Sequence, residues 1–323
     1  MKAIVFHQYG APDVLKYEEV DKPVPGDDQI LLRVHAASVN PLDWHGMRGK
    51  PYIMRVASGL RQPKANRLGT DVAGQVEAAG RNVTRFKPGD SVFGVCRGAF
   101  SEYACARESA LTLKPDHVTF EQAAAVPVAA FTALQGLRDK GRLQSGQKVL
   151  INGAAGGVGT FAVQIARSLG AEVTGVCSTR NVDLVGSIGA DSVIDYSKED
   201  FTTSQQRFDV IFDCMGNHSL LACRRLLTPT GTYVAVGGPN GPLMGPLAFW
   251  MRVLVFSRFV SQTMLMFIAN PNRKDLAYMG ELVETGKVSP VIERRYGLAE
   301  VPEAIRHLER GHARGKVIIA VRA

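Results

Sequence analysis

The chain has 323 residues, enough for two domains of ordinary size, and 46% of them are hydrophobic while 21% are charged. This balance excludes a disordered chain, a collagen-like fibre and a disulfide-rich miniprotein. Thirty-eight Lys and Arg against 30 Asp and Glu give a net charge of +8. Such an excess permits an anionic partner (a nucleotide phosphate, nucleic acid or an anionic membrane) without choosing among them.

The first 120 residues are mainly β-rich. Short runs over 2–6, 30–39, 74–80 and 90–96 are separated by turn signals such as Pro25-Gly26 and Pro88-Gly89. The pattern then changes to an Ala-rich stretch of helical period over 121–141. Pro127 lies inside that stretch and must kink it or split it in two.

From residue 148 onward strands and helices alternate. The strands are expected over 148–153, 172–177, 192–196, 208–214 and 232–238, and the helices over 158–170, 182–189 and 219–227. This alternation predicts a doubly wound parallel sheet with helices on both faces. The remaining chain adds helices over 275–286 and 301–311 and a closing strand over 316–321.

The segment 247–268 is the most apolar of the chain. It contains Arg252 and Arg258, each of which costs about 2.5–3.5 kcal/mol at the centre of a bilayer, so we do not expect it to span a membrane. We favour a helix over 248–266 that is buried in a dimer interface or over the substrate pocket, and an interfacial membrane helix is the alternative. Five scattered cysteines without a CxxC pair, and an N-terminus unlike a signal peptide, favour a reduced cytoplasmic protein.

A glycine-rich turn follows the first strand of the alternating region. Residues 155–159 read Ala155, Gly156, Gly157, Val158 and Gly159 and lead directly into a helix. Glycines let a backbone approach a pyrophosphate, whose charge is stabilised by the amides at the helix N-terminus. The turn therefore predicts a dinucleotide site, and a glycine turn without a nucleotide is the alternative.

The end of the next strand bears on the choice of cofactor. An NAD site would place an acid about 20 residues after the glycines, but this chain has Ser178 and Arg180 there. A hydroxyl and a guanidinium suit the 2′-phosphate of NADPH, although Arg180 can also be a solvated cation. We further expect Tyr196 beside the adenosine, and Gly237 and Gly238 beside the nicotinamide.

Seven short motifs are spread over nearly the whole chain. They are 38–44 (SVNPLDW), 69–74 (GTDVAG), 86–90 (FKPGD), 123–127 (AAAVP), 154–159 (AAGGVG), 193–196 (VIDY) and 315–317 (GKV). Together they resemble the zinc-independent, quinone oxidoreductase-like medium-chain dehydrogenases/reductases. Within that family, the motifs at 38–44 and 69–74 most resemble the plant chloroplast-envelope quinone oxidoreductases.

This resemblance implies an α/β protein with two domains. A β-rich GroES-like catalytic domain would comprise 1–122 and 266–323, and a Rossmann NADP(H)-binding domain would comprise 123–265. It also implies NADPH-dependent reduction of a quinone or an α,β-unsaturated carbonyl, and a homodimer. Asn40 and Thr70 stand where zinc-dependent relatives have a Cys and a His ligand, and neither residue type binds zinc well, so we expect no metal.

The resemblance also suggests which residues take part in the reaction. We expect Asn40 to contact the substrate or the nicotinamide ribose, and Lys316 to contact the cofactor. His45 is a candidate general acid because its ordinary pKa lies near neutrality, and Tyr52 is a second candidate donor. Asp71 is expected to support the domain, and water is an alternative source of the proton.

The sequence leaves other functions open. The segment 44–68, which we expect to form a loop, carries six cations and no acid. It can steer an anionic substrate, contact an anionic membrane or simply be solvated. The main alternative function is a non-catalytic NADPH-binding redox sensor or structural protein. We find no nucleic-acid recognition motif and expect no such partner.

Overall fold

The computed structural model describes residues 1–238, 251–255, 257–258, 260–311 and 313–321. The chain forms two compact units, which we call the terminal unit (Met1–Val128 with Pro271–Ala323) and the central unit (Ala129–Asn270). The sequence placed these divisions after 122 and after 265, a few residues earlier in both cases. The first division lies later because helix α3 (Phe120–Ala125) packs against strands of the terminal unit.

The terminal unit is built on a seven-stranded sheet. The strand order is β14-β15-β3-β4-β5-β7, and β6 pairs with β3. Separately, β1 (Lys2–Val5) and β2 (Lys16–Glu19) form an antiparallel pair. The bounds of the sheet strands are β3 Gln29–Val39, β4 Asp71–Ala79, β5 Ser91–Val95, β6 Tyr103–Arg107, β7 Leu111–Leu113, β14 Ile292–Gly297 and β15 Lys316–Ala320.

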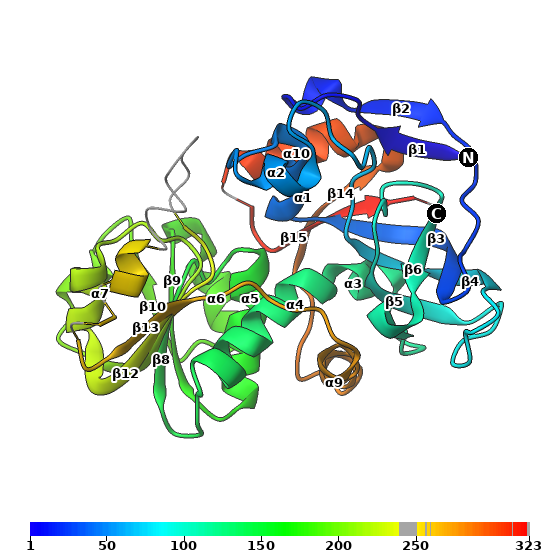
Figure 1. Ribbon diagram of the computed structural model, residues 1–323. Coiled ribbons are helices and arrows are strands. Elements are labelled where there is room, and N and C mark those ends of the chain that lie inside the picture. The colour runs from blue at the N-terminus through cyan, green and yellow to red at the C-terminus, as the bar shows by residue number, and fades with distance from the viewer. Residues whose placement is uncertain (239–250, 256, 259, 312, 322–323) are drawn as a thin grey trace. The chain divides into compact units, whose positions relative to one another are not determined.

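Both ends of the chain contribute to this unit. In Figure 1 the blue strands near the N-terminus lie beside the orange helix α10 and the red strand β15 from the C-terminal part. Strand pairing explains why the two ends of the chain share one sheet, because β15 pairs antiparallel with β3, with Val317 opposite Val39. The helices are α1 Pro41–Arg48, α2 Met54–Ser58, α3, α9 Arg273–Glu284 and α10 Val301–Glu309. Helix α10 buries Val301, Ala304 and Ile305 in the same core as β3 and β15.

The central unit contains a six-stranded sheet in which all the strand pairs are parallel. Its order is β10-β9-β8-β11-β12-β13. The strands are β8 Lys148–Asn152, β9 Glu172–Cys177, β10 Ser192–Asp195, β11 Phe208–Asp213, β12 Leu227–Ala235 and β13 Thr263–Met266. In chain order this is 3-2-1-4-5-6, the order of a dinucleotide-binding doubly wound sheet.

The helices of the central unit follow the predicted alternation. They include α4 Pro127–Leu134, which begins in the terminal unit, α5 Gly157–Ser168, α6 Val182–Ser187 and α7 Leu220–Arg225, with a π-helical stretch over Gln135–Lys140. Short 3₁₀ segments lie at Pro12–Val14, Glu108–Ala110, Thr179–Asn181, Phe201–Thr203 and Leu298–Glu300. Pro127 does split the Ala-rich run, because α3 ends at Ala125 and α4 begins at Pro127.

Three expectations from the sequence differ from the structure. The prediction of a single helix over 248–266 is wrong at its C-terminal end, because 263–266 is the edge strand β13, which pairs with β12. Residues 248–250, 256 and 259 of that segment lie outside the described residues, while 251–255 are helical. The segment 44–68 was treated as a loop but contains part of α1 and all of α2. The strands β2, β6, β7 and β14 were not predicted, and in β2 all four residues are exposed and lack an apolar alternation.

Candidate functional site

In the central unit the strands after β8 are added on one side of it up to β10, and on its other side from β11 onward. Open α/β sheets bind ligands at this switch point between β8 and β11. The last residues of those two strands are Asn152 and Asp213, and both are buried. Asn152 Nδ2 donates to Asp213 Oδ1 at 2.9 Å. The backbone amides of Met215 and Gly216 donate to the same oxygen, each at 2.9 Å. One carboxylate therefore fixes the loop that leaves the sheet at its switch point.

Tyr233 completes this buried group from the neighbouring strand β12. Its hydroxyl donates to Asp213 Oδ2 at 2.7 Å. Burial and the nearby carboxylate raise the pKa of Tyr233, so its hydroxyl keeps its proton and acts as a donor. The sequence reasoning missed Asn152, Asp213 and Tyr233. The available signal was a polar residue at the carboxyl end of each of two buried strands.

The glycine turn lies between β8 and α5, as predicted. Gly153 has a φ of +84°, which favours glycine. A Cβ on Gly159 would lie 2.1 Å from the carbonyl oxygen of Gly153, so only glycine lets the first turn of α5 approach the strand this closely. The N-cap position of α5 is Gly156, which has no side chain to cover the first amides. The turn of Ala155, Gly157 and Val158 thus fits a pyrophosphate held by backbone amides.

The predicted ribose and phosphate residues lie just beyond β9. Ser178 Oγ accepts from Asn181 Nδ2 at 3.2 Å, which orients the hydroxyl. Arg180 lies in the short 3₁₀ segment after β9 and is exposed. Thr179 donates to Asp195 at 2.6 Å, and this bond is the main reason why the pKa of Asp195 is lowered. Asp195 is therefore an anion engaged with Thr179.

Tyr196, Gly237 and Gly238 lie at the same edge of the sheet, each after the end of a strand. Tyr196 follows β10 and is 54% exposed, so its side chain is accessible. Gly237 follows β12, and a Cβ there would lie 1.9 Å from the carbonyl oxygen of Cys214. Glycine is therefore required where the segments after β11 and β12 meet.

A buried polar cluster lies at the ends of three strands in the terminal unit. Lys316 Nζ donates to Asn40 Oδ1 at 2.6 Å and to Asp71 Oδ2 at 3.3 Å. Asn40 Nδ2 donates to the same Asp71 oxygen at 2.8 Å, and Ser38 Oγ does so at 2.7 Å. The amide of Val128 donates to Asp71 Oδ1 at 3.0 Å. We call Ser38, Asn40, Asp71 and Lys316 the strand-end cluster.

Asp43 is a second buried carboxylate, next to the strand-end cluster. It accepts from the amide of Asn40 at 2.8 Å and from the amide of Gly69 at 3.2 Å. Burial raises its pKa to about 7, and the charge of Asp71 adds to this, while the two amides and Lys316 act in the opposite direction. Asp43 therefore links the start of α1 to the 69–74 motif, and the sequence reasoning gave it no role.

His45 lies in α1, but its geometry does not favour a general acid. Its Nδ1 lies 2.9 Å from the carbonyl oxygen of Lys50, and a carbonyl accepts only from a protonated nitrogen. Burial lowers the pKa of His45 below its ordinary value. The ring is thus neutral at pH 7, with the proton on Nδ1 and a lone pair on Nε2. It also stacks on Trp44, with ring centroids 3.7 Å apart.

The other candidate donor, Tyr52, precedes α2 and is 41% exposed. The guanidinium of Arg55 lies over its ring, 4.8 Å from the centroid. Arg55 also donates to the carbonyl oxygens of Gly49 and Arg48. Tyr52 therefore belongs to the packing of this segment, and its use as a donor remains a prediction.

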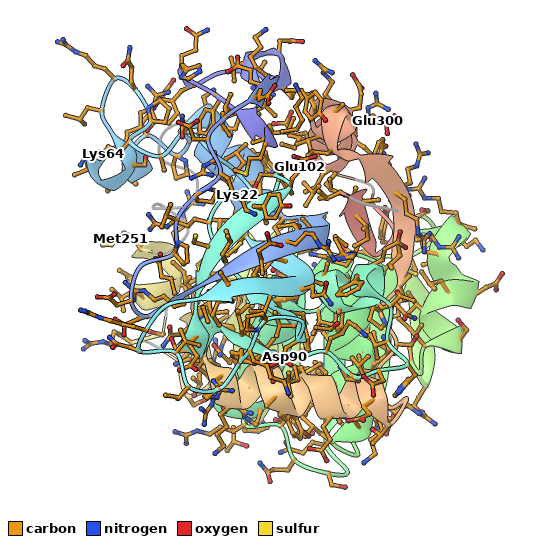
Figure 2. All side chains as sticks on the ribbon, turned by 90° about the vertical axis from the view of Figure 1, so that its right-hand side faces the viewer. Lys22, Lys64, Asp90, Glu102, Met251 and Glu300 are labelled. Atoms are coloured by element: carbon orange, nitrogen blue, oxygen red, sulfur yellow. The ribbon has the colours of Figure 1, made fainter. Side chains whose placement is uncertain are left out.

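Four of the six cations of the segment 44–68 fall into two groups. Arg48 forms a two-pronged ion pair with Glu309, and Arg55 is engaged as described, so both have structural roles. Arg61 and Lys64 are exposed, and Figure 2 shows Lys64 on the outer side of its loop. No helix in the part of the chain that the structure describes is long and apolar enough to cross a membrane.

Comparisons with known proteins agree with this geometry. Residues 26–116 match the alcohol dehydrogenase GroES-like domain, and 188–319 match the zinc-binding dehydrogenase family. The chloroplast envelope quinone oxidoreductase homologue of Arabidopsis thaliana is 31% identical over 99% of this chain and 98% of its own length.

Two further proteins are similar over most of their length. The NADPH-dependent alkenal/one oxidoreductase of the same plant is 31% identical, over 99% of this chain and 79% of that protein. The structure of the quinone oxidoreductase from Coxiella burnetii has a TM-score of 0.89 and 32% identity, over 100% of this chain and 99% of that chain. The chain belongs to the medium-chain dehydrogenase/reductase family. Its quinone oxidoreductase-like resemblance and its fold class, GroES-like with a Rossmann unit, are confirmed.

Proposed function

We propose that this protein is an NADPH-dependent reductase that transfers hydride to a quinone or an α,β-unsaturated carbonyl without zinc. A nicotinamide dinucleotide is the cofactor class supported by the family and by the glycine turn. The observation that carries the proposal is the engagement of Asn40. At a family zinc-ligand position, its side-chain oxygen accepts from Lys316 and its nitrogen donates to Asp71.

The zinc-free part of the proposal follows from the chemistry of these donors. An amide oxygen shared with an ammonium group is a poor ligand for zinc, which prefers thiolate, imidazole or carboxylate. Thr70 occupies the second family ligand position and is equally unsuited. Without a Lewis acid, oxidation of an alcohol loses its usual means of stabilising an alkoxide. Conjugate reduction depends less on such a cation, because the developing charge spreads over an enolate.

The chain's own residues would then bind and orient. The amides of 157–159 would hold the pyrophosphate, and Ser178 and Arg180 would hold the 2′-phosphate. The bound nicotinamide would supply the hydride. Because His45 presents a lone pair at Nε2 and not a proton, we propose that water supplies the proton.

The first experiment follows NADPH oxidation by the purified protein against a panel of quinones and alkenals, with NADP⁺ plus primary alcohols as the comparison. We expect turnover with the first two classes and full activity after dialysis against a chelator. Stoichiometric zinc, with activity lost on chelation, would refute the zinc-free reaction. Binding of NADPH without turnover of any acceptor would favour the sensor alternative.

The second experiment tests the cofactor choice with Arg180→Ala. A charge-assisted hydrogen bond contributes about 1.5–3 kcal/mol, so we expect KM for NADPH to rise roughly 10- to 100-fold while KM for NADH changes little. Arg207→Ala is the matched control, because Arg207 is also exposed but precedes β11, at the opposite edge of the sheet. Equal effects of Arg180→Ala on both cofactors would contradict the assignment to the 2′-phosphate.

A further inference from the structure

The most unusual cation in the described chain is Lys316, which is only 3% exposed. Lysine is almost never fully buried unless it is paired. Its partner Asp71 is 0% exposed, so neither charge is solvated. Removing both charges from water costs several kcal/mol per ion, and this cost is offset only by good geometry and further hydrogen bonds. A gain in stability therefore does not by itself explain a buried ion pair of this kind.

The register of three strands brings the pair together. Val317 of β15 lies opposite Val39 of β3, so Lys316 and Asn40 stand at the same level. On the other side of β3, Ser38 lies opposite Asp71, the first residue of β4. Residues far apart in the chain, Lys316 and Asp71, are therefore delivered to the two sides of Asn40 by antiparallel pairing.

The bonds among these three residues form a closed ring. Lys316 Nζ donates to Asn40 Oδ1, Asn40 Nδ2 donates to Asp71 Oδ2, and Lys316 Nζ donates to that same Asp71 oxygen. Rotating the amide by 180° would place its NH₂ group against the ammonium and its oxygen against the carboxylate. Only one orientation of the Asn40 amide is therefore compatible with its neighbours.

Asn40 also begins the helix that carries His45. It is the N-cap residue of α1, and its backbone amide donates to Asp43 at 2.8 Å. Its side chain is thus held by the ion pair while its backbone is held by α1. A shift of the ion pair would move both the amide and the first turn of that helix.

We propose that Lys316 and Asp71 are positioning residues, whose ion pair fixes the Asn40 amide and the start of α1 for the reductase reaction. This inference rests on the proposed function and changes the expected role of Lys316. Its ammonium is used by Asn40 and Asp71, so it acts through Asn40 and not by direct contact with the cofactor. The ion pair supplies orientation, since an uncharged cluster of similar volume would accept either orientation of the amide.

The test uses Lys316→Met, Asp71→Asn and the double variant Lys316→Met/Asp71→Asn in the full chain. Each single variant leaves one buried charge without its partner and is expected to lower the melting temperature. The double variant removes both charges and should recover much of that loss. Lys114→Met is the matched control, because this lysine, also in the terminal unit, donates to the carbonyl oxygens of Pro115, Asp116 and Val118 and lies over the ring of Phe120.

For the double variant we expect kcat with the best acceptor to fall on the order of 10- to 100-fold, as for a misplaced reacting group. The Kd for NADPH, measured by nucleotide fluorescence, should stay within about twofold of the wild-type value if orientation alone is lost. Lys114→Met should leave both quantities unchanged.

Two results would overturn the inference while the wild type remains active. A folded double variant with wild-type kcat would show that the ion pair is only structural. A tenfold or greater rise in Kd for NADPH would show that Lys316 contacts the cofactor directly. A wild type inactive with every quinone and enone would instead refute the proposed function, and this inference with it.

Discussion

The buried carboxylate of Asp43 leads to a pH-dependent stability that can be measured. Its pKa is raised from 3.8 to about 7 in the folded protein, mainly by burial. Between these two values the folded protein binds a proton that the unfolded chain has released. The free energy of unfolding should therefore fall as pH rises through this window. The contribution of Asp43 is complete below pH 4 and is lost above pH 7.

The magnitude follows from the size of the pKa change. At about 1.4 kcal/mol per pKa unit, a rise of roughly 3 units amounts to about 4 kcal/mol over the whole window. About 2 kcal/mol of this should be lost between pH 5 and pH 7. The variant Asp43→Asn does not titrate. The asparagine side chain has one acceptor oxygen for the two amides of Asn40 and Gly69. The substitution should therefore lower the free energy of unfolding by about 1–3 kcal/mol at pH 5.

The assay is urea unfolding of wild type and Asp43→Asn at pH 5, 6 and 7. Fluorescence of Trp44, the residue next to Asp43, reports unfolding in a Trp250→Phe background. We expect the difference between the two proteins to shrink by about 2 kcal/mol from pH 5 to pH 7, because only the wild type loses this contribution. Asp200→Asn is the control, since hydrogen bonds from Thr202 lower the pKa of Asp200 and its difference from wild type should stay constant. Parallel profiles for wild type and Asp43→Asn would refute the reasoning.

Two further predictions concern the glycine turn and His45. Gly159→Ala should abolish NADPH binding and destabilise the central unit, because its Cβ would overlap the carbonyl oxygen of Gly153. Gly186→Ala in α6 is the control, because a Cβ there meets nothing within 4 Å and the variant should bind NADPH normally. Equal affinity of the two variants in a binding titration would contradict the close approach. His45→Asn, which can still donate to the carbonyl oxygen of Lys50, should keep its kcat and its rate profile between pH 6 and pH 8, and loss of turnover on the acid side alone would restore His45 as a proton donor.

The parts that local pattern controls were predicted well. The alternation after residue 148 predicted the parallel sheet from β8 to β12, and the split at Pro127 followed from the lost N–H of proline. The edge strand β13 was not predicted, because its short apolar run does not distinguish a strand from a helix. Cytoplasmic location and the homodimer stay predictions.

The residues of the candidate site also divide into those that a local sequence pattern indicates and those that it does not. The glycines and Ser178–Arg180 could be proposed from the sequence because backbone approach and phosphate binding require those residue types within one short segment. Asn152, Asp213 and Tyr233 could not, since each comes from a different strand. They meet only through the crossover connections of the sheet.

By itself the sequence determined the family, the two-unit organisation and the class of cofactor, because glycine turns and alternating periods are local consequences of backbone geometry. The tertiary structure alone decided the contacts of Asn40, His45 and Lys316. Antiparallel pairing brings Lys316 to Asn40 across 276 positions of the chain, and burial next to Lys50 leaves His45 neutral. Charge state and orientation depend on neighbours and on exclusion of water, and the order of residues does not encode these locally.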